Sequence, residues 1–121
     1  MIKIAFFDTE DEYNKTYNYQ ITYFESRLNA ETAPLAKGYD VVCIFVNDKA
    51  DKETLDILNE SGVKLLALRC AGFNNVDLKH LGNIRAVRVP QYSPYAVAEH
   101  ATALLLNINR KIYKSYQRVK K

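Results

Sequence analysis

One stretch of the sequence has the residue types of an anion-binding turn. It reads RCAGFNNVD, from Arg69 to Asp77, and follows an apolar run typical of a buried strand. Gly72 permits a tight turn at the end of that strand, where the backbone amides of Ala71, Gly72 and Phe73 would be free. Free amides that converge in such a turn bind small anions. The same spacing is also compatible with an ordinary strand-to-helix turn.

A second stretch offers a hydroxyl group in a comparable position. It reads VPQYSPYAVAEH, from Val89 to His100. Pro90 ends the preceding apolar run, and Tyr92 follows in a loop, where its hydroxyl can donate a hydrogen bond to a ligand. The alternative interpretation is that Tyr92 packs against its neighbours.

Acidic residues indicate a different chemistry, the acceptance of a phosphoryl group. Asp8 and Asp11 follow the first predicted strand, and Asp48 follows the third. A receiver-like signalling domain with Asp48 as phospho-acceptor has such an arrangement. It also needs a lysine at the end of the fifth strand, where this sequence reads Arg88–Val89–Pro90. The receiver interpretation is therefore the weaker alternative.

The elements that must position these residues alternate between strand and helix. Apolar runs predict strands at 2–7, 19–24, 41–46, 64–70 and 86–89, the first apolar enough to be buried on both faces of a sheet. The segments between them predict helices at 10–18, 29–38, 51–62 and 76–81, with Asn29 and Asp51 as N-caps. This order predicts an α/β fold with a doubly wound, flavodoxin-like parallel sheet. Ligands bind such sheets at the carboxyl ends of the strands, where both stretches lie.

The last segment predicts one long helix from Pro94 to about Arg118. Ser93 is a suitable N-cap, and proline is favoured at the first helical position. Apolar residues then recur at helical spacing: Val97, Ala101, Leu104, Leu105, Ile108 and Ile112. A helix of this length spans roughly 37 Å, about the width of the whole domain. The carboxyl end of this helix must project from the domain or pack against another part of the protein. We therefore expect the helix to lead into a part of the protein that this chain lacks.

The charge is concentrated at the carboxyl end. The net charge is +3, and residues 110–121 contain six basic residues and no acid. A nucleic-acid-binding module is the corresponding alternative, because such a tail can neutralise phosphates. Cations are also favoured at a helix C-terminus, however, and the rest of the chain is mildly acidic. We therefore expect no nucleic-acid partner.

Length and composition favour one small cytoplasmic domain. The chain has 121 residues, of which 48% are hydrophobic and 26% charged, so it is not a disordered sequence. No apolar run reaches the roughly 18 residues of a membrane span, and the amino terminus lacks the features of a secretory signal. Cys43 and Cys70 are too few for a metal cage and are expected to be buried thiols. His80 is expected to be a surface residue.

Both stretches, with VVCIFVND at 41–48 and KLLALRCAGFNNVDL at 64–78, resemble the amino-terminal part of the D-isomer-specific 2-hydroxyacid dehydrogenases. Within that family the bacterial D-lactate dehydrogenases are the most similar. Members have a substrate-binding, or catalytic, lobe built from both ends of the chain and an NAD-binding lobe inserted between them. The resemblance covers essentially the whole chain. It implies that residues 1–92 belong to the substrate-binding lobe and that residues 93–121 are the connecting helix.

The resemblance assigns few roles within this chain. It implies that the amides of Ala71 and Gly72 hold the substrate carboxylate and that Tyr92 lines the pocket. Arg69 matches a polar position at the same rim without an assigned contact. His100, beside Glu99, falls on the connecting helix, where the resemblance implies a structural or hinge-facing position. The family's catalytic histidine, carboxylate and arginine have no counterpart here, nor does its glycine-rich NAD loop, since the sequence contains no G-x-G. We expect no catalytic, cofactor-binding or metal-binding residue in the chain.

The sequence thus predicts the amino-terminal fragment of an NAD-dependent D-2-hydroxyacid dehydrogenase that oxidises D-lactate to pyruvate. The fragment is expected to be inactive alone and to bind no NAD. Its ligand would be a small 2-oxo or 2-hydroxy acid. The apolar stripe of the last helix predicts a homodimer, because an uncovered apolar patch favours self-association.

Overall fold

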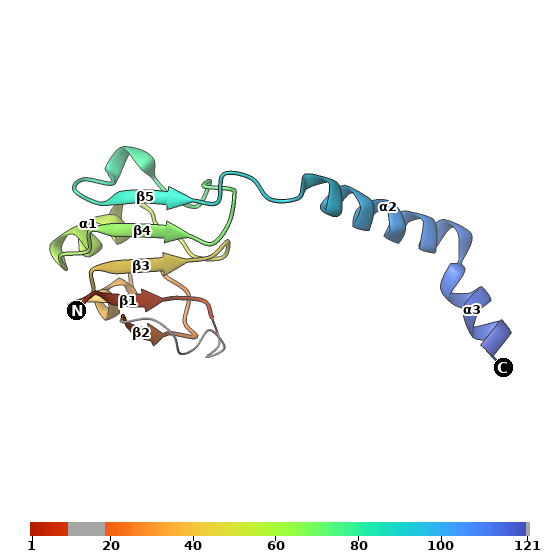
Figure 1. Cartoon of the computed structure of the whole chain (residues 1–121). Helices are drawn as coiled ribbons and strands as arrows, with labels where there is room; N and C mark the ends of the chain where they lie inside the picture. Colours follow the sequence, from red (N-terminus) through yellow and green to blue (C-terminus); the bar gives the residue numbers. More distant parts are fainter. Residues whose placement is uncertain (10–18, 121) are drawn as a thin grey trace. The chain divides into compact units, whose positions relative to one another are not determined.

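The computed structural model describes residues 1–9 and 19–120. Within them, five strands form one sheet in the order β2-β1-β3-β4-β5, and every neighbouring pair is parallel (Figure 1). The strands are β1 (Lys3–Phe6), β2 (Gln20–Tyr23), β3 (Val41–Ile44), β4 (Leu65–Leu68) and β5 (Arg85–Arg88). The predicted parallel sheet is confirmed, with strand ends within two residues of the expected ones.

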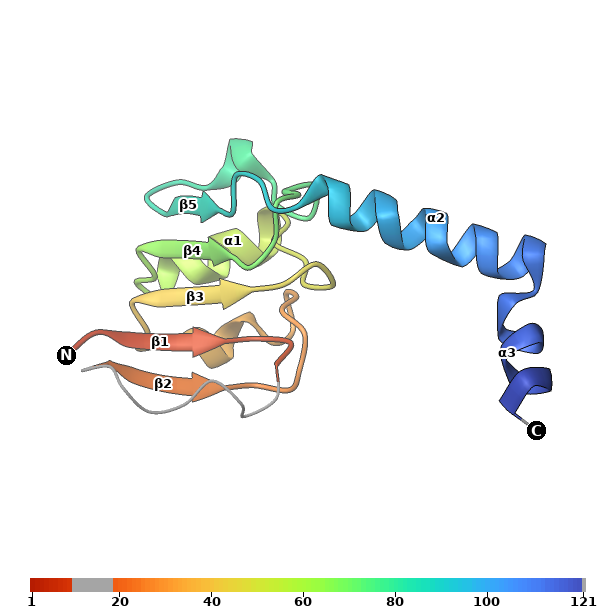
Figure 2. The same ribbon diagram turned by 45° about the vertical axis from the view of Figure 1, so that its right-hand side comes forward.

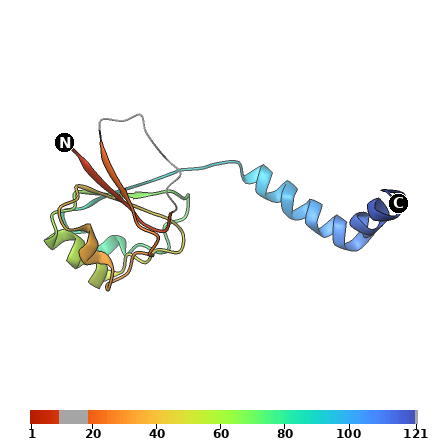
Figure 3. The ribbon, with the colours of Figure 1, turned by 90° about the horizontal axis from the view of Figure 1, so that it is seen from below.

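Three helical segments of the sheet domain are described. They are η1 (Ala33–Ala36), α1 (Lys52–Glu60) and η2 (Leu78–His80), of which η1 and η2 are short 3₁₀ turns. All three lie on the same face of the sheet when it is seen along its edge (Figure 3). The predicted helix at 10–18, with Asp11, lies outside the described residues.

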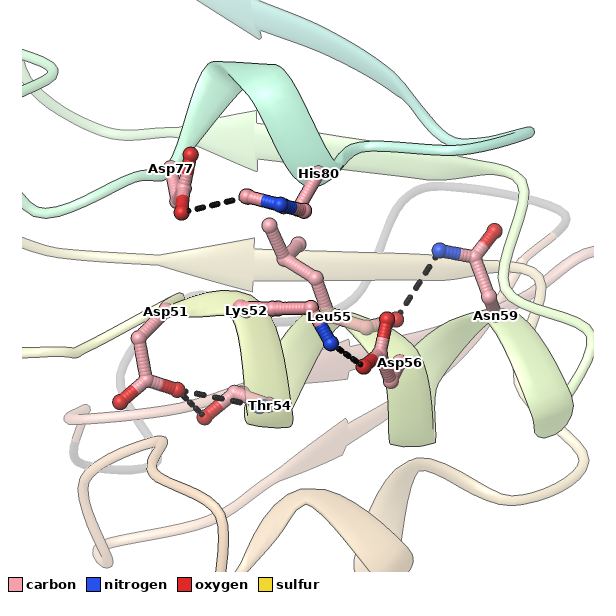
Figure 4. A network of polar contacts seen from close by, with 8 residues as sticks. All are labelled: Asp51, Lys52, Thr54, Leu55, Asp56, Asn59, Asp77 and His80. Carbon is pink, nitrogen blue, oxygen red and sulfur yellow. Dashed lines mark hydrogen bonds and ion pairs between the residues drawn. The ribbon is translucent and has the colours of Figure 1, made fainter.

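Helix α1 is fixed at its start by the side chain predicted to cap it. The Asp51 carboxylate accepts hydrogen bonds from the backbone amide of Thr54 at 3.0 Å and from its hydroxyl at 2.8 Å (Figure 4). Near the end of the helix, the Asn59 side chain donates to the carbonyls of Leu55 and Leu81. The bond to Leu81 ties α1 to the segment that leads into β5.

His80 lies on the surface, as predicted. Its side chain is exposed, and its Nδ1 lies 2.7 Å from the carboxylate of Asp77 (Figure 4). Asp77 is the N-cap residue of η2, whose side chain also accepts from the Lys79 amide. The pair stabilises a surface turn.

The core lies between the sheet and its helical layer. Alternate residues along and just after the strands, among them Phe7, Ile44 and Leu66, are fully buried in one cluster with Leu55 and Leu58 of α1. The opposite face is less covered by the described residues: the register aligns Phe6, Cys43, Ala67 and Val87 in one row, and Val87 is 51% exposed. The prediction that the first strand is buried on both faces is therefore wrong for the described part, because every described helical segment of this domain packs on one face.

The chain divides into two units, Met1–Pro90 and Gln91–Lys121. The second contains α2 (Pro94–Arg110) and α3 (Ile112–Lys120), so the prediction of one continuous helix is wrong. Lys111 adopts a left-handed conformation, with φ 53°, and the Asn107 side chain accepts from the amide of Tyr113 at 3.0 Å. These contacts end the first helix and begin the second.

Two further features belong to this second unit. Pro94 occupies the first turn of α2, as predicted, but Ser93 makes no capping bond with its side chain, since its own backbone has φ 26°. The two helices bury none of their residues against each other. Across the part of the chain that the structure describes, no helix is long and apolar enough to cross a membrane.

Candidate functional site

The loops that follow the strands meet at one edge of the sheet, because all five strands run in the same direction (Figure 2). The segment after β4 contains the predicted anion-binding turn. The Arg69 amide still pairs with the carbonyl of Ile44 at 2.9 Å, and the Cys70 carbonyl accepts from the amide of Val89 at 3.3 Å. The chain leaves the sheet at Ala71.

The turn itself leaves its backbone amides unpaired. Among the described residues, no acceptor takes the N–H groups of Ala71, Gly72 or Phe73. The backbone of Gly72 is not in the left-handed region. Instead, a Cβ atom at this position would have no other atom within 4 Å. The absent side chain therefore leaves open space beside the free amides.

The carbonyl groups of the same turn are occupied. The Cys70 thiol lies 3.2 Å from the carbonyl oxygen of Gly72, and Nη1 of Arg88 donates to the carbonyl of Ala71 at 2.8 Å. A turn whose acceptors are engaged and whose donors are free is suited to bind an anion.

Asn75 fastens the end of this turn to the loop after β3. Its side-chain amide donates to the carbonyl of Phe45 at 3.0 Å and to that of Asp48 at 2.9 Å. Its own carbonyl accepts from the amide of Ala50 at 2.8 Å. The two loops therefore form one connected surface.

Asp48 is buried and serves the backbone. Its side chain, only 1% exposed, accepts from the amides of Leu28 and Phe45, each at 2.6 Å. Burial raises the pKa of this carboxyl above its usual value, and the nearby Asp8 adds to the rise, whereas the two amides and Arg69 oppose it. With both oxygens engaged, Asp48 is not available as a phospho-acceptor, and the receiver interpretation is not favoured.

Arg69 connects the ends of β4 and β1. Its Nη2 donates to the carbonyls of Phe7 at 2.7 Å and Asp8 at 3.1 Å, and its guanidinium lies over the rings of Phe6 and Phe45. These contacts fully occupy one terminal nitrogen within the sheet edge. Arg69 therefore joins the ends of β4 and β1 through Nη2, while its buried Nε has no hydrogen-bond partner among the described residues.

Both cysteines are buried free thiols, as predicted. Burial raises the pKa of the Cys43 thiol to about 11, although Arg69 opposes the rise. Burial raises the pKa of Cys70 in the same way. A raised pKa disfavours the thiolate, which is the reactive form of a cysteine.

Tyr92 lies in the second unit, where it starts the segment before α2. Its placement toward the turn at Ala71 and Gly72 stays a prediction. His100 lies within α2 and is exposed, and its expected role stays a prediction.

Sequence reasoning missed three residues that shape the turn: Asp48 in its structural role, Asn75 and Arg88. Asn75 had a local signal, because asparagine following a strand end is typical of a residue that bonds to nearby backbone. No local signal pointed to the bond from Leu28 to Asp48 or to the bond from Arg88 to Ala71. In each case the two residues are 17 or more positions apart in the sequence.

The sequence pattern of the family described as "D-isomer specific 2-hydroxyacid dehydrogenase, catalytic domain" matches residues 4–118. The chain belongs to this family. The resemblance seen in the two loop stretches is thereby confirmed, and the nucleic-acid and receiver alternatives are not favoured.

Curated relatives and solved structures agree with this assignment. A 2-hydroxyacid dehydrogenase homolog from Schizosaccharomyces pombe is 52% identical over 98% of the chain, and D-lactate dehydrogenase from Escherichia coli is 43% identical over 98%. The apo-structure of the Escherichia coli enzyme superimposes with a TM-score of 0.83 at 41% identity, covering 98% of this chain and 41% of that one. This family member spans 39% of the length of each of the two curated relatives.

The described residues do not fit an NAD site. A dinucleotide loop needs glycines between a strand and the start of a helix. Here Gly38, Gly62 and Gly82 have positive φ and follow helical segments, and Gly72 is the one glycine that follows a strand. The same described residues contain no cluster of three side chains that could hold a metal ion.

Proposed function

We propose that this chain supplies part of the substrate-binding lobe of an NAD-dependent D-2-hydroxyacid dehydrogenase that interconverts D-lactate and pyruvate. The observation that carries the proposal is the open turn at Ala71 and Gly72, on a chain of this family, with free amides and occupied carbonyls. The name of the Escherichia coli relative supports D-lactate as substrate. A structure from Aquifex aeolicus, 27% identical with a TM-score of 0.72, is of a D-lactate dehydrogenase complexed with NAD and lactic acid.

The chemistry of the turn suits the carboxylate of a small 2-oxo or 2-hydroxy acid. Hydrogen bonds from amides to a charged acceptor are about twice as strong as those to a neutral one. The amides of Ala71 and Gly72 would hold the carboxylate, and the Tyr92 hydroxyl would donate to the substrate from the following loop. In this proposal residues 1–92 belong to the substrate-binding lobe, and residues 93–121 connect it to the NAD-binding lobe.

By the complete enzyme we mean a protein of the length of the curated relatives that contains residues 1–121. The remaining chemistry would come from the other part of that enzyme. NAD would exchange the hydride there, and the residues that move the hydroxyl proton would lie there too. We further propose that the complete enzyme is a homodimer in the cytoplasm. The two free thiols are in keeping with a reducing compartment.

The test compares the complete enzyme with the 121-residue chain. The complete enzyme should form NADH from D-lactate and not from L-lactate, and the chain alone should form none. Turnover of another 2-hydroxy acid but not of D-lactate would overturn the substrate assignment. NADH formation in proportion to the isolated chain would overturn the assignment of the chemistry to the missing part.

A further inference from the structure

Arg88 is the last residue of β5, and it contacts the proposed carboxylate-binding turn in two ways. Its Nη1 donates to the carbonyl of Ala71 at 2.8 Å. Its guanidinium carbon also lies 5.0 Å from the centre of the Phe73 ring. The same nitrogen also donates to the carbonyl of Pro90 at 3.3 Å. Nη1 of Arg88 therefore serves one carbonyl in the loop after β4 and one in the loop after β5.

The bond to Ala71 acts on the amide of Gly72. The carbonyl of Ala71 and the N–H of Gly72 belong to the same peptide unit, which is planar and trans, since the described chain contains no cis peptide bond. In such a unit the C=O and the N–H point in opposite directions. Holding the carbonyl toward Arg88 therefore directs the Gly72 N–H away from β5.

The next peptide unit is held in the same manner, by a weaker donor. The Cys70 thiol lies 3.2 Å from the carbonyl of Gly72, whose peptide partner is the N–H of Phe73. Both peptide units are thus fixed from the carbonyl side, while their N–H groups remain free. A binding group that is already oriented loses less conformational freedom when its ligand arrives.

We propose that Arg88 is a positioning residue for substrate: it orients the Gly72 amide toward the substrate carboxylate by holding the Ala71 carbonyl. This proposal rests on the proposed function of the turn. Arg88 acts through the backbone, and its own guanidinium does not bind the carboxylate. The alternative, direct contact of Arg88 with the substrate, is an outcome that the experiment distinguishes.

The variants separate the hydrogen bond from the packing. Arg88→Met removes the donors and keeps an unbranched apolar side chain against Phe73, while Arg88→Lys keeps one cationic donor. Arg85→Met is the matched control, because Arg85 lies on the same strand, is exposed, and has no side-chain hydrogen bond or ion pair among the described residues.

The first measurement uses the 121-residue chain and the heteronuclear ¹⁵N relaxation of the Gly72 amide. In Arg88→Met this amide should become as mobile as a loop residue, while the amides of the sheet core keep their relaxation. Arg88→Lys should restore much of the order, and Arg85→Met should leave it unchanged. A Gly72 amide that stays equally ordered in Arg88→Met overturns the proposal.

The second measurement uses the complete enzyme and the kinetics of pyruvate reduction. Loss of one oriented donor should raise the KM for pyruvate about two- to ten-fold, with kcat nearly unchanged, because the carboxylate is bound equally before and during hydride transfer. The KM for NADH should not change. A protein that was merely destabilised would lose active molecules instead, which lowers kcat and leaves KM unchanged.

The two measurements fail in different ways. A raised KM with an unchanged Gly72 amide would show that Arg88 contacts substrate itself and would overturn the positioning role. An unchanged KM in an enzyme that reduces pyruvate would overturn it too, while the proposed function stands. An enzyme that does not use 2-oxo acids would refute the proposed function and, with it, the substrate part of this inference.

Discussion

The amide side chain of Asn75 offers a sharp test of how the edge of the sheet is held. It donates two hydrogen bonds, at 3.0 Å to Phe45 and at 2.9 Å to Asp48, between the loops after β4 and β3. Asn75→Ala removes both donors and leaves two carbonyl groups without them. A neutral hydrogen bond contributes about 0.5–1.5 kcal/mol, so the variant should lose about 1–3 kcal/mol of the free energy of unfolding. In a unit of this size that corresponds to a melting temperature lower by about 4–24 °C.

The chain provides a matched control for this variant in the adjacent residue. Asn74 is exposed, and its side chain makes no hydrogen bond among the described residues. Asn74→Ala should therefore change the free energy of unfolding by less than about 0.5 kcal/mol. A third variant, Asn75→Asp, places a carboxylate against two carbonyl oxygens and should be at least as unstable as Asn75→Ala.

Urea unfolding followed through the labelled methyl groups of Leu66 is the suitable assay. Leu66 is fully buried in the core of the first unit, so its signal reports on that unit and not on α2 or α3. If Asn75→Ala were as stable as Asn74→Ala, the side chain would not join the two loops. If Asn75→Asp were more stable than Asn75→Ala, the amide nitrogen and oxygen of Asn75 would be interchanged.

Three further predictions concern the thiols, the tyrosine and the association of the chain. Burial raises the pKa of Cys43 to about 11 and also raises that of Cys70. Iodoacetamide at neutral pH should therefore label neither thiol in the folded chain. Both thiols should be labelled in urea, and mass spectrometry measures the difference. Labelling should accelerate as the pH rises toward the raised pKa, and rapid labelling of the folded chain near pH 7 would contradict the burial of the thiols. In the complete enzyme, Tyr92→Phe should lower kcat/KM for pyruvate about two- to twelve-fold, the worth of one hydrogen bond, without changing the KM for NADH; wild-type kinetics would remove Tyr92 from the site. The chain should have twice its monomer mass in light scattering at micromolar concentrations, and Leu105→Glu in the apolar stripe of α2 should halve that mass; a monomeric wild-type chain would refute the role of the stripe.

The order of the elements could be predicted because parallel strands leave a strong trace in the sequence. Runs such as VVCIFV are long enough for a strand and too short for a helix, and the capping residue Asp51 marks the start of α1. The turn at Gly72 could be located for the same reason, since it directly follows such a run. The alternation of strands and helices predicts the class of fold, a doubly wound parallel sheet. It does not by itself predict the order of the strands within that sheet.

The contacts that hold the site could not be predicted, because their partners are far apart in the sequence. Arg69 donates to the carbonyl of Phe7, 62 residues away, and Arg88 to that of Ala71, 17 residues away. Such a bond depends on where the strands place the backbone carbonyl, and any side chain with an N–H or O–H donor can make it. The break at Lys111 was missed for a related reason: no glycine or proline marks it, and the Asn107 side chain supports it from the preceding turn.

The carboxyl edge of the sheet is joined from strand to strand by side chains that bond to the backbone. Asp48 links the loops after β2 and β3, Asn75 those after β3 and β4, Arg69 joins β4 to β1, and Arg88 joins β5 to the turn. Each link uses a carbonyl or an amide that lies outside the strand pairing. The amides of the turn at Gly72 are left out of the network. In the proposed function, the carboxylate of the substrate supplies the acceptor that these amides lack.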